Sequence, residues 1–194
     1  MADFQSIAAT GKSIERVLQA CFEEDEPAPP SKTKARLIRS EDFEGNGITR
    51  PALSVFLYRV GVNGVMRAAW SAVGSLDGRA HLPIDLHFML TAWATNAEHE
   101  QQILGRAMQC LEMRPILSGP VLYPGSNWAP NEAVQVVADD VSTETLMRTF
   151  DSLDADFRLS VAYIARIVRI DGTTATPSPP VTTVIGGGTP SLTP

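Results

Sequence analysis

Asp85 and His87 are the two residues in this sequence whose types and spacing are best suited to catalysis. They lie in LPIDLHFMLTAWA, residues 82–94, where apolar and polar positions alternate as they do in a β-strand. Residues i and i+2 of a strand point to the same side, so the aspartate could orient the histidine as a general base. A polar strand face explains the same pattern, and no nucleophile accompanies the pair. We therefore expect a structural role, and catalysis by Asp85 and His87 is the alternative.

Other motifs that mark catalytic or cofactor sites are not found. The three histidines, His81, His87 and His99, lack the short spacing that metal ligands usually show. The glycines at 186–188 are followed by no predicted helix, which a phosphate-binding loop would need. There is also no GxSxG, HExxH or P-loop pattern. The sequence thus predicts no catalytic set, no bound metal and no cofactor.

The composition limits the classes of partner. With 44% hydrophobic and 20% charged residues, the chain is typical of a soluble globular domain. Its formal net charge of −6 lacks the basic footprint of a nucleic-acid-binding protein. No uninterrupted apolar stretch reaches the ~18 residues that a membrane-spanning helix needs. We therefore expect neither nucleic acid nor a membrane span among its interactions.

The cysteines and the amino terminus bear on the compartment. Cys21 and Cys110 are far apart and have no CxxC partner, and each falls on the apolar side of a predicted helix. Their pattern favours small buried thiols in a reducing compartment. The first residues show no basic segment followed by a long apolar run, as a signal peptide would. The expected location is the cytoplasm.

Strands and helices alternate without a strict βαβ rhythm. Helical spacing of apolar residues predicts helices over 3–23, over 95–114 and from Ser142 onward. Strand patterns lie at 34–39, 52–64, 82–94, 132–140 and 157–170. This order predicts a single-domain α+β fold, in which one mixed β-sheet is flanked by amphipathic helices.

Several local details follow from the same patterns. Asp3 and Thr95 are predicted N-caps, the latter in a capping box with Glu98. Asp139 and Asp140 precede the Ser142 helix and are expected to help cap it. One face of the last strand is predicted to carry Phe157, Leu159, Val161, Tyr163, Ala165 and Ile167.

The carboxyl-terminal segment differs from the rest of the chain. Residues 1–172 form the predicted domain, and residues 173–194 form a Pro/Thr/Gly-rich tail without a charged residue. Within this tail, Val181, Thr182, Thr183, Val184 and Ile185 are all β-branched, which strongly favours a strand. Five residues make no stable strand alone, so this one would need the edge of a host sheet.

Two segments also carry a family resemblance. LSVFLYRVGVNGVMRAAW (53–70) and DGRAHLPIDLHFMLTAWATNAEHEQQILGRAMQCLEMRPIL (77–117) resemble tail-terminator or cap proteins of extracellular contractile injection systems. These are phage-tail-like particles of the antifeeding-prophage and Photorhabdus virulence cassette type. The similar features are the strand ending in LYRV, the DGR turn, the LPxDLHxxLT strand and the helix that ends at RPIL.

The resemblance implies a phage tail-terminator-like fold and a non-enzymatic role. Such a protein would form a homo-hexameric ring that binds the inner tube protein and the terminal sheath protein, stops polymerisation and fixes particle length. It would assemble in the cytoplasm, as part of a particle that is released or membrane-anchored. The expected interface residues are Leu122, Tyr123 and Trp128 of the 116–131 loop, and Val181, Thr182, Thr183, Val184 and Ile185 of the tail, which would add as a strand to a neighbouring chain.

Overall fold

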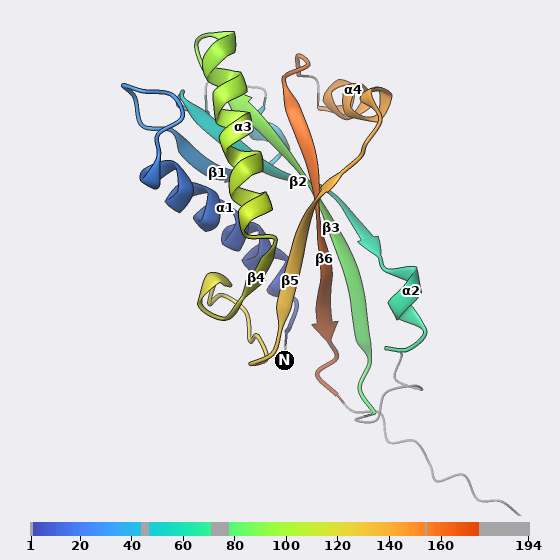
Figure 1. Ribbon diagram of the computed structural model, residues 1–194. Helices are drawn as coiled ribbons and strands as arrows, with labels where there is room; N and C mark the ends of the chain where they lie inside the picture. The colour runs from blue at the N-terminus through green and yellow to red at the C-terminus, as the bar shows by residue number, and fades with distance from the viewer. Residues whose placement is uncertain (1, 44–46, 71–77, 154, 175–194) are drawn as a thin grey trace, which may run out of the picture.

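The computed structural model describes residues 2–43, 47–70, 78–153 and 155–174 of the 194-residue chain (Figure 1). Its elements are, in order, α1 (Ser6–Glu24), β1 (Lys34–Ile38), η1 (Ser40–Asp42), β2 (Ala52–Val62), α2 (Gly64–Arg67), β3 (His81–Trp93), α3 (Ala97–Met113), β4 (Ile116–Ser118), η2 (Gly119–Val121), β5 (Ala133–Asp139), α4 (Thr143–Ser152) and β6 (Ser160–Asp171). Each helix and strand predicted within residues 1–172 is present, with ends that differ by a few residues.

The six strands form one mixed sheet in the order β1-β2-β3-β6-β5-β4. β1 runs parallel to β2, and the other neighbouring strands are antiparallel. β3, the strand that carries Asp85 and His87, has 13 residues and lies between β2 and β6 near the centre of the sheet. The predicted α+β class with a mixed sheet is confirmed.

One face of the sheet carries the main hydrophobic core beneath α1 and α3, which cross it side by side (Figure 1). Every second residue of β3 from Ile84 to Ala92 is buried in this core, as the strand alternation predicts. The helices meet the sheet with stripes spaced by three or four residues, Ile14, Leu18 and Cys21 on α1 and Ile103, Ala107 and Leu111 on α3. Met108, which follows Ala107 on the helix, is 40% exposed.

The opposite face carries a smaller core at one end only. Met89 and Trp93 of β3 pack there with Phe43 and with Phe150, the single buried residue of α4. The rings of Phe43 and Phe150 meet edge to face with centroids 5.9 Å apart. This face of β3 is therefore apolar toward Trp93 and polar toward Asp85.

Cys21 and Cys110 form a disulfide between α1 and α3, with 6.3 Å between their Cα atoms. The expected burial is confirmed, because both residues are at most 1% exposed. The expectation of two separate reduced thiols is wrong. Their separation of 89 residues gave no sign of pairing, and only the crossing of the two helices brings them together.

Both long helices begin slightly later than predicted. α1 starts at Ser6 with Gln5 as its N-cap residue, so Phe4 lies outside the helix and is 77% exposed. Asp3 lies before the helix, and its carboxylate accepts a hydrogen bond from the backbone amide of Gln5 at 2.9 Å. The assignment of Asp3 as the N-cap is therefore wrong by two residues.

At α3 the N-cap is Asn96 rather than Thr95, and its side chain accepts from the backbone amide of His99 at 2.8 Å. Asparagine is at least as good an N-cap as threonine, and the shift by one residue removes the predicted capping box with Glu98. At α4 the predicted Ser142 cap is confirmed, because its hydroxyl accepts from the amide of Thr145 at 3.2 Å.

β6 departs from the predicted alternation. It begins at Ser160, so Phe157 and Leu159 precede it and are exposed. Its register against β3 shifts between the Ile84 and Leu86 pairs, whose partners are Val168 and Ala165. This bulge reverses the facing of later residues, so Val168, and not Ile167 as predicted, enters the core.

The second half of β2 projects beyond the helical layer. Only its first residues are buried, whereas Val60 and Val62 are at least half exposed. α2 follows directly and continues the projection (Figure 1). We call residues 58–67 the β2–α2 arm.

Among the described helices, none is both long enough and apolar enough to cross a lipid bilayer.

Candidate interaction site

His87 is held by groups from β2, the neighbouring strand, and from β5, which lies on the far side of β6. It is 9% exposed, and its Nδ1 lies 3.0 Å from an Asp139 carboxylate oxygen on β5. On the β2 side, the Tyr58 ring meets the imidazole edge to face, with centroids 6.1 Å apart. The expectation that Asp139 helps to cap α4 is therefore incorrect, because its carboxylate is directed to His87.

Asp85 has a different partner. Both of its carboxylate oxygens accept from the Asn63 side-chain amide, at 3.2 and 3.0 Å. Asn63 is also the N-cap of α2, where its side-chain oxygen accepts from the Met66 amide at 3.1 Å. Asp85 thus fastens the β2–α2 arm to β3, which favours the structural interpretation of the pair.

The pKa of Tyr58, whose ring lies beside His87, is shifted by its surroundings. Burial raises the pKa of Tyr58 above its ordinary value, the nearby Asp139 carboxylate raises it further, and Arg59 lowers it. The tyrosine is therefore neutral at physiological pH and does not act as a base. Among the described residues, no group of three or more His, Cys, Asp or Glu side chains is placed to hold a metal ion.

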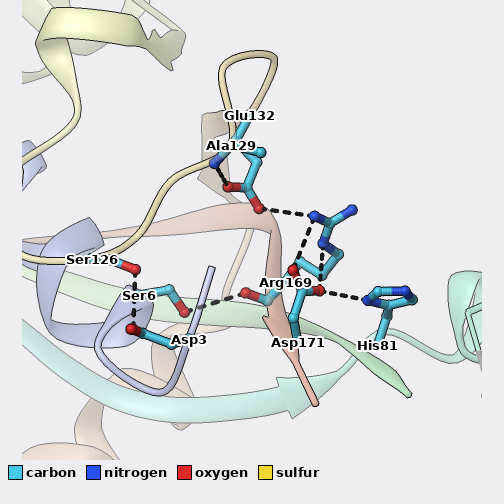
Figure 2. A network of polar contacts seen from close by, with 8 residues as sticks. All are labelled: Asp3, Ser6, His81, Ser126, Ala129, Glu132, Arg169 and Asp171. Atoms are coloured by element: carbon cyan, nitrogen blue, oxygen red, sulfur yellow. Dashed lines mark hydrogen bonds and ion pairs between the residues drawn. The ribbon is translucent and has the colours of Figure 1, made fainter. Parts of the chain in front are cut away.

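A second polar network lies at the start of β3, where that strand pairs with the end of β6 (Figure 2). His81, at the start of β3, contacts the buried Asp171 carboxylate at the end of β6 through Nδ1. Arg169 pairs with the same carboxylate, with 2.8 Å between Nε and Oδ1, and reaches Glu132 at 3.5 Å. Sequence reasoning missed this network, because the histidine and the aspartate are 90 residues apart.

This network fixes the point from which the tail departs. The Asp171 amide donates to the carbonyl of Ala2 at 2.9 Å, and the Gly172 amide donates to the carbonyl of Ala80 at 2.7 Å. Asp3 accepts from Ser126 and Asn127 at 3.3 and 2.9 Å, which adds the 119–131 loop to the same region. The end of β6 is therefore held by the amino-terminal residues and by the residue before β3, and the amino-terminal residues are in turn held by a loop.

The predicted interface residues of the loop have unequal positions. Leu122 is 4% exposed and belongs to the main core, so in this chain it anchors the loop. Trp128 packs partly against that core and donates through Nε1 to the Tyr123 carbonyl at 2.8 Å. The Tyr123 ring remains 37% exposed, with the Arg16 guanidinium 5.8 Å from its centre.

The expected tail strand cannot be placed in the same way. Val181, Thr182, Thr183, Val184 and Ile185 lie outside the described residues.

The fold, with α1 and α3 on one face of a curled mixed sheet, resembles that of a tail terminator. The chain belongs to the family described as Pvc16 N-terminal domain, whose model matches residues 9–183. The resemblance found in residues 53–117 is thereby confirmed and extended over most of the chain. The family match includes the first eleven residues of the tail, 173–183.

Two solved structures match the chain. The sheath/tube terminator of an extracellular contractile injection system, PVC, in its extended state is 20% identical, with a TM-score of 0.56 over 96% of this chain. This chain spans 65% of that protein's length. The tube-terminating cap of the anti-feeding prophage is 18% identical over 69% of this chain and 49% of the cap, with a TM-score of 0.42. Among curated protein sequences, none matches the chain.

Proposed function

We propose that this chain is a structural cap that closes the inner tube and sheath of a phage-tail-like contractile injection particle. The observation that carries the proposal is the family match over residues 9–183, together with a shared fold over 96% of the chain with a sheath/tube terminator. In this role the protein stops polymerisation and so fixes particle length. It is assembled in the cytoplasm with the particle.

The proposed assembly is a homo-hexameric ring on the last ring of the tube. A ring of identical chains closes through a heterologous contact, in which two different surfaces of each chain meet. Its remaining partners are the inner tube protein and the terminal sheath protein. Tyr123 supports a contact role for the 119–131 loop, because this aromatic ring is exposed while Leu122 and Trp128 hold the loop in place.

The tail is the proposed link to the sheath. Val181–Ile185 would add as a strand to the edge of a neighbouring sheet in the last sheath ring. The firm attachment of β6 at Asp171 and Gly172 supports this role, because a strand that transmits a contact needs a fixed root.

No catalytic step is included in the proposal. Asp85 and His87 bond to Asn63 and Asp139, and these contacts account for both side chains without a substrate.

The test is particle length in cells that assemble the particle. Deletion of the gene should give tubes and sheaths of broad, longer length distribution in negative-stain micrographs, and expression of this chain should restore a narrow one. An unchanged length distribution, with this chain missing from purified particles, would overturn the proposal. A particle structure in which the chain has a symmetry other than that of the tube would exclude the hexameric ring.

A further inference from the structure

One end of the molecule combines exposed apolar side chains with acidic ones. We call residues 140–153 and 155–159, which comprise α4 and the described residues on either side of it, the acidic end. Three of its large apolar residues are exposed, Met147, Phe157 and Leu159. Four of its acids are also exposed, Asp140, Glu144, Asp151 and Asp156. Its basic residues are Arg148, paired with Glu144 at 2.8 Å, and Arg158, stacked on Trp93.

Two exposed apolar residues of the acidic end, Met147 and Phe157, flank the buried Phe150. Phe157 meets Phe150 edge to face, with centroids 5.5 Å apart, and Met147 lies one turn before Phe150 on α4. Phe150 alone enters the core, so both flanking side chains remain about half exposed. Exposed apolar residues that gather in this way mark a contact surface, whereas single ones do not.

The β2–α2 arm has the opposite charge. Val60, Val62 and Val65 are exposed along it, and the last is 89% exposed. Arg59 and Arg67 are its exposed charged residues. Of the acids near the arm, Asp85 accepts from Asn63 of the arm, and Asp139, which acts on the Tyr58 phenol, contacts His87. The arm therefore presents valines and net positive charge.

The two surfaces lie at opposite ends of β3. Val62 of the arm pairs with Ile84, and Leu159 of the acidic end accepts a hydrogen bond from the Ala92 amide. The eight steps along the strand from Ile84 to Ala92 span about 27 Å at the usual rise per residue. Figure 1 shows α2 and α4 at these two ends of the sheet. One chain can therefore use both surfaces at once.

We propose that the acidic end of one copy binds the β2–α2 arm of the next copy, head to tail. The exposed valines of the arm would pack against Met147, Phe157 and Leu159 at the apolar centre of the contact. The opposite charges of the two surfaces would lie at its rim and set its orientation. Like charges keep arm from arm and acidic end from acidic end, which selects the heterologous contact over a two-fold one. The inference deepens the proposed function, because it names the surfaces that close the ring.

Charge exchange between the surfaces tests the contact. The first variant carries Asp151→Lys and Asp156→Lys, and the second carries Arg59→Glu and Arg67→Glu. All four side chains are exposed, and a lysine near the end of α4 suits the helix dipole, so both variants should fold. In sedimentation velocity at low salt, each variant alone should lose the concentration-dependent association of the wild type.

An equimolar mixture of the two variants should regain association. Every contact in an alternating assembly then joins opposite charges, and a ring with an even number of copies can close. A single chain with all four substitutions should associate as well. Matched controls place the same charge changes elsewhere, Glu23→Lys with Glu112→Lys and Lys32→Glu with Lys34→Glu, and should associate like the wild type.

Three results would overturn the inference: a wild type that stays monomeric at about 200 µM in low salt, folded variants that associate alone, or a mixture that stays monomeric. The proposed function is judged separately by particle length. If the mixture associates but loss of the gene leaves particle length unchanged, the contact is real and the capping role is wrong. If length depends on the gene but the exchanged charges have no effect, the capping role is supported and the proposed contact is wrong.

Discussion

His87 lies where one face of β3 changes from apolar to polar. Toward Trp93 the face packs under Phe150, and toward Asp85 it meets Asn63 and the arm. A buried imidazole at such a border needs a partner for its polar nitrogen atoms, and the Asp139 carboxylate provides one at 3.0 Å. The catalytic alternative of Asp85 and His87 would instead require these two residues to contact each other, and Asp85 bonds to Asn63.

The two faces of β3 should respond differently to substitution. Asp85→Asn and His87→Gln keep a hydrogen-bonding group, and each should cost at most about 1–2 kcal/mol of stability. Leu86→Asp or Phe88→Asp should prevent folding, because both residues are at most 1% exposed and the new charge would be buried without a partner. Circular dichroism and urea unfolding measure both effects.

The enzyme alternative is tested by the same variants. If His87→Gln folds and assembles normally but abolishes the biological activity of the particle, a chemical role for His87 is restored.

Tyr58 should contribute to a loss of stability at alkaline pH. An unfolded tyrosine loses its proton at about pH 10, and burial raises the pKa of Tyr58 above that in the folded chain. The folded state therefore holds the proton more tightly, so the stability is fully present below about pH 10 and is lost as pH rises through the folded pKa. Urea unfolding between pH 8 and 11 should show a smaller decline for Tyr58→Phe, and an identical decline would contradict the assignment.

At the level of elements, α1 covers the outer edge of β1. Its Glu15 and Gln19 side chains accept hydrogen bonds from the Leu37 and Ala35 amides on the outer edge of β1, each at 3.0 Å. Edge amides without such partners can pair with other chains. This edge is therefore closed to strand addition by the side chains of the covering helix.

The disulfide is the strongest link between α1 and α3. It closes a loop of about 90 residues, for which the loss of unfolded-state entropy corresponds to about 2–5 kcal/mol. Cys21→Ala with Cys110→Ala should therefore lower the Tm by about 5–15 °C, with the fold retained. Scanning calorimetry with and without reductant measures the effect.

Reductant is the internal control for this prediction. It should lower the Tm of the wild type and leave that of the double alanine variant unchanged. An oxidised wild type with the Tm of the double variant would show that the bond adds no stability.

On the scale of the whole molecule, the described chain has one covered face and two exposed ends. α1 and α3 close the main core, whereas the acidic end and the β2–α2 arm leave apolar side chains in solvent. The tail departs beside the base of β3 and β6, where the His81, Asp171 and Arg169 contacts hold the strands together. Most of the buried apolar residues thus lie between the helices and the sheet, and the exposed apolar side chains named here lie at the two ends.

Removal of residues 173–194 tests the tail. The truncated chain should fold with an unchanged Tm, because the contacts of Asp171 remain, and it should still bind the tube but join the sheath poorly. Replacement of Val181–Ile185 by five glycine and serine residues is the matched control for length and should have the same effect. Normal sheath attachment and normal particle length in both variants, measured on purified particles, would contradict the role of the tail.

The sequence by itself determined the elements and the fold class. Alternation in 82–94 and helical spacing around Ile103 depend on local geometry, since side chains repeat every two residues in a strand and every 3.6 in a helix. The Ser142 cap is equally local, because its hydrogen bond spans three residues. The resemblance in residues 53–117 likewise needed only the order of residues, and the family match agrees with it.

Only the tertiary structure decided which distant residues meet. The Cys21–Cys110 bond, the His87–Asp139 contact and the His81–Asp171 contact join residues 89, 52 and 90 positions apart. The β6 bulge likewise depends on the register with β3, and it exchanges Val168 for Ile167 in the core. Periodicity shows which side of an element is buried, but not which element covers it. Partners are fixed by strand order and helix crossing, which arise from the packing of the whole chain.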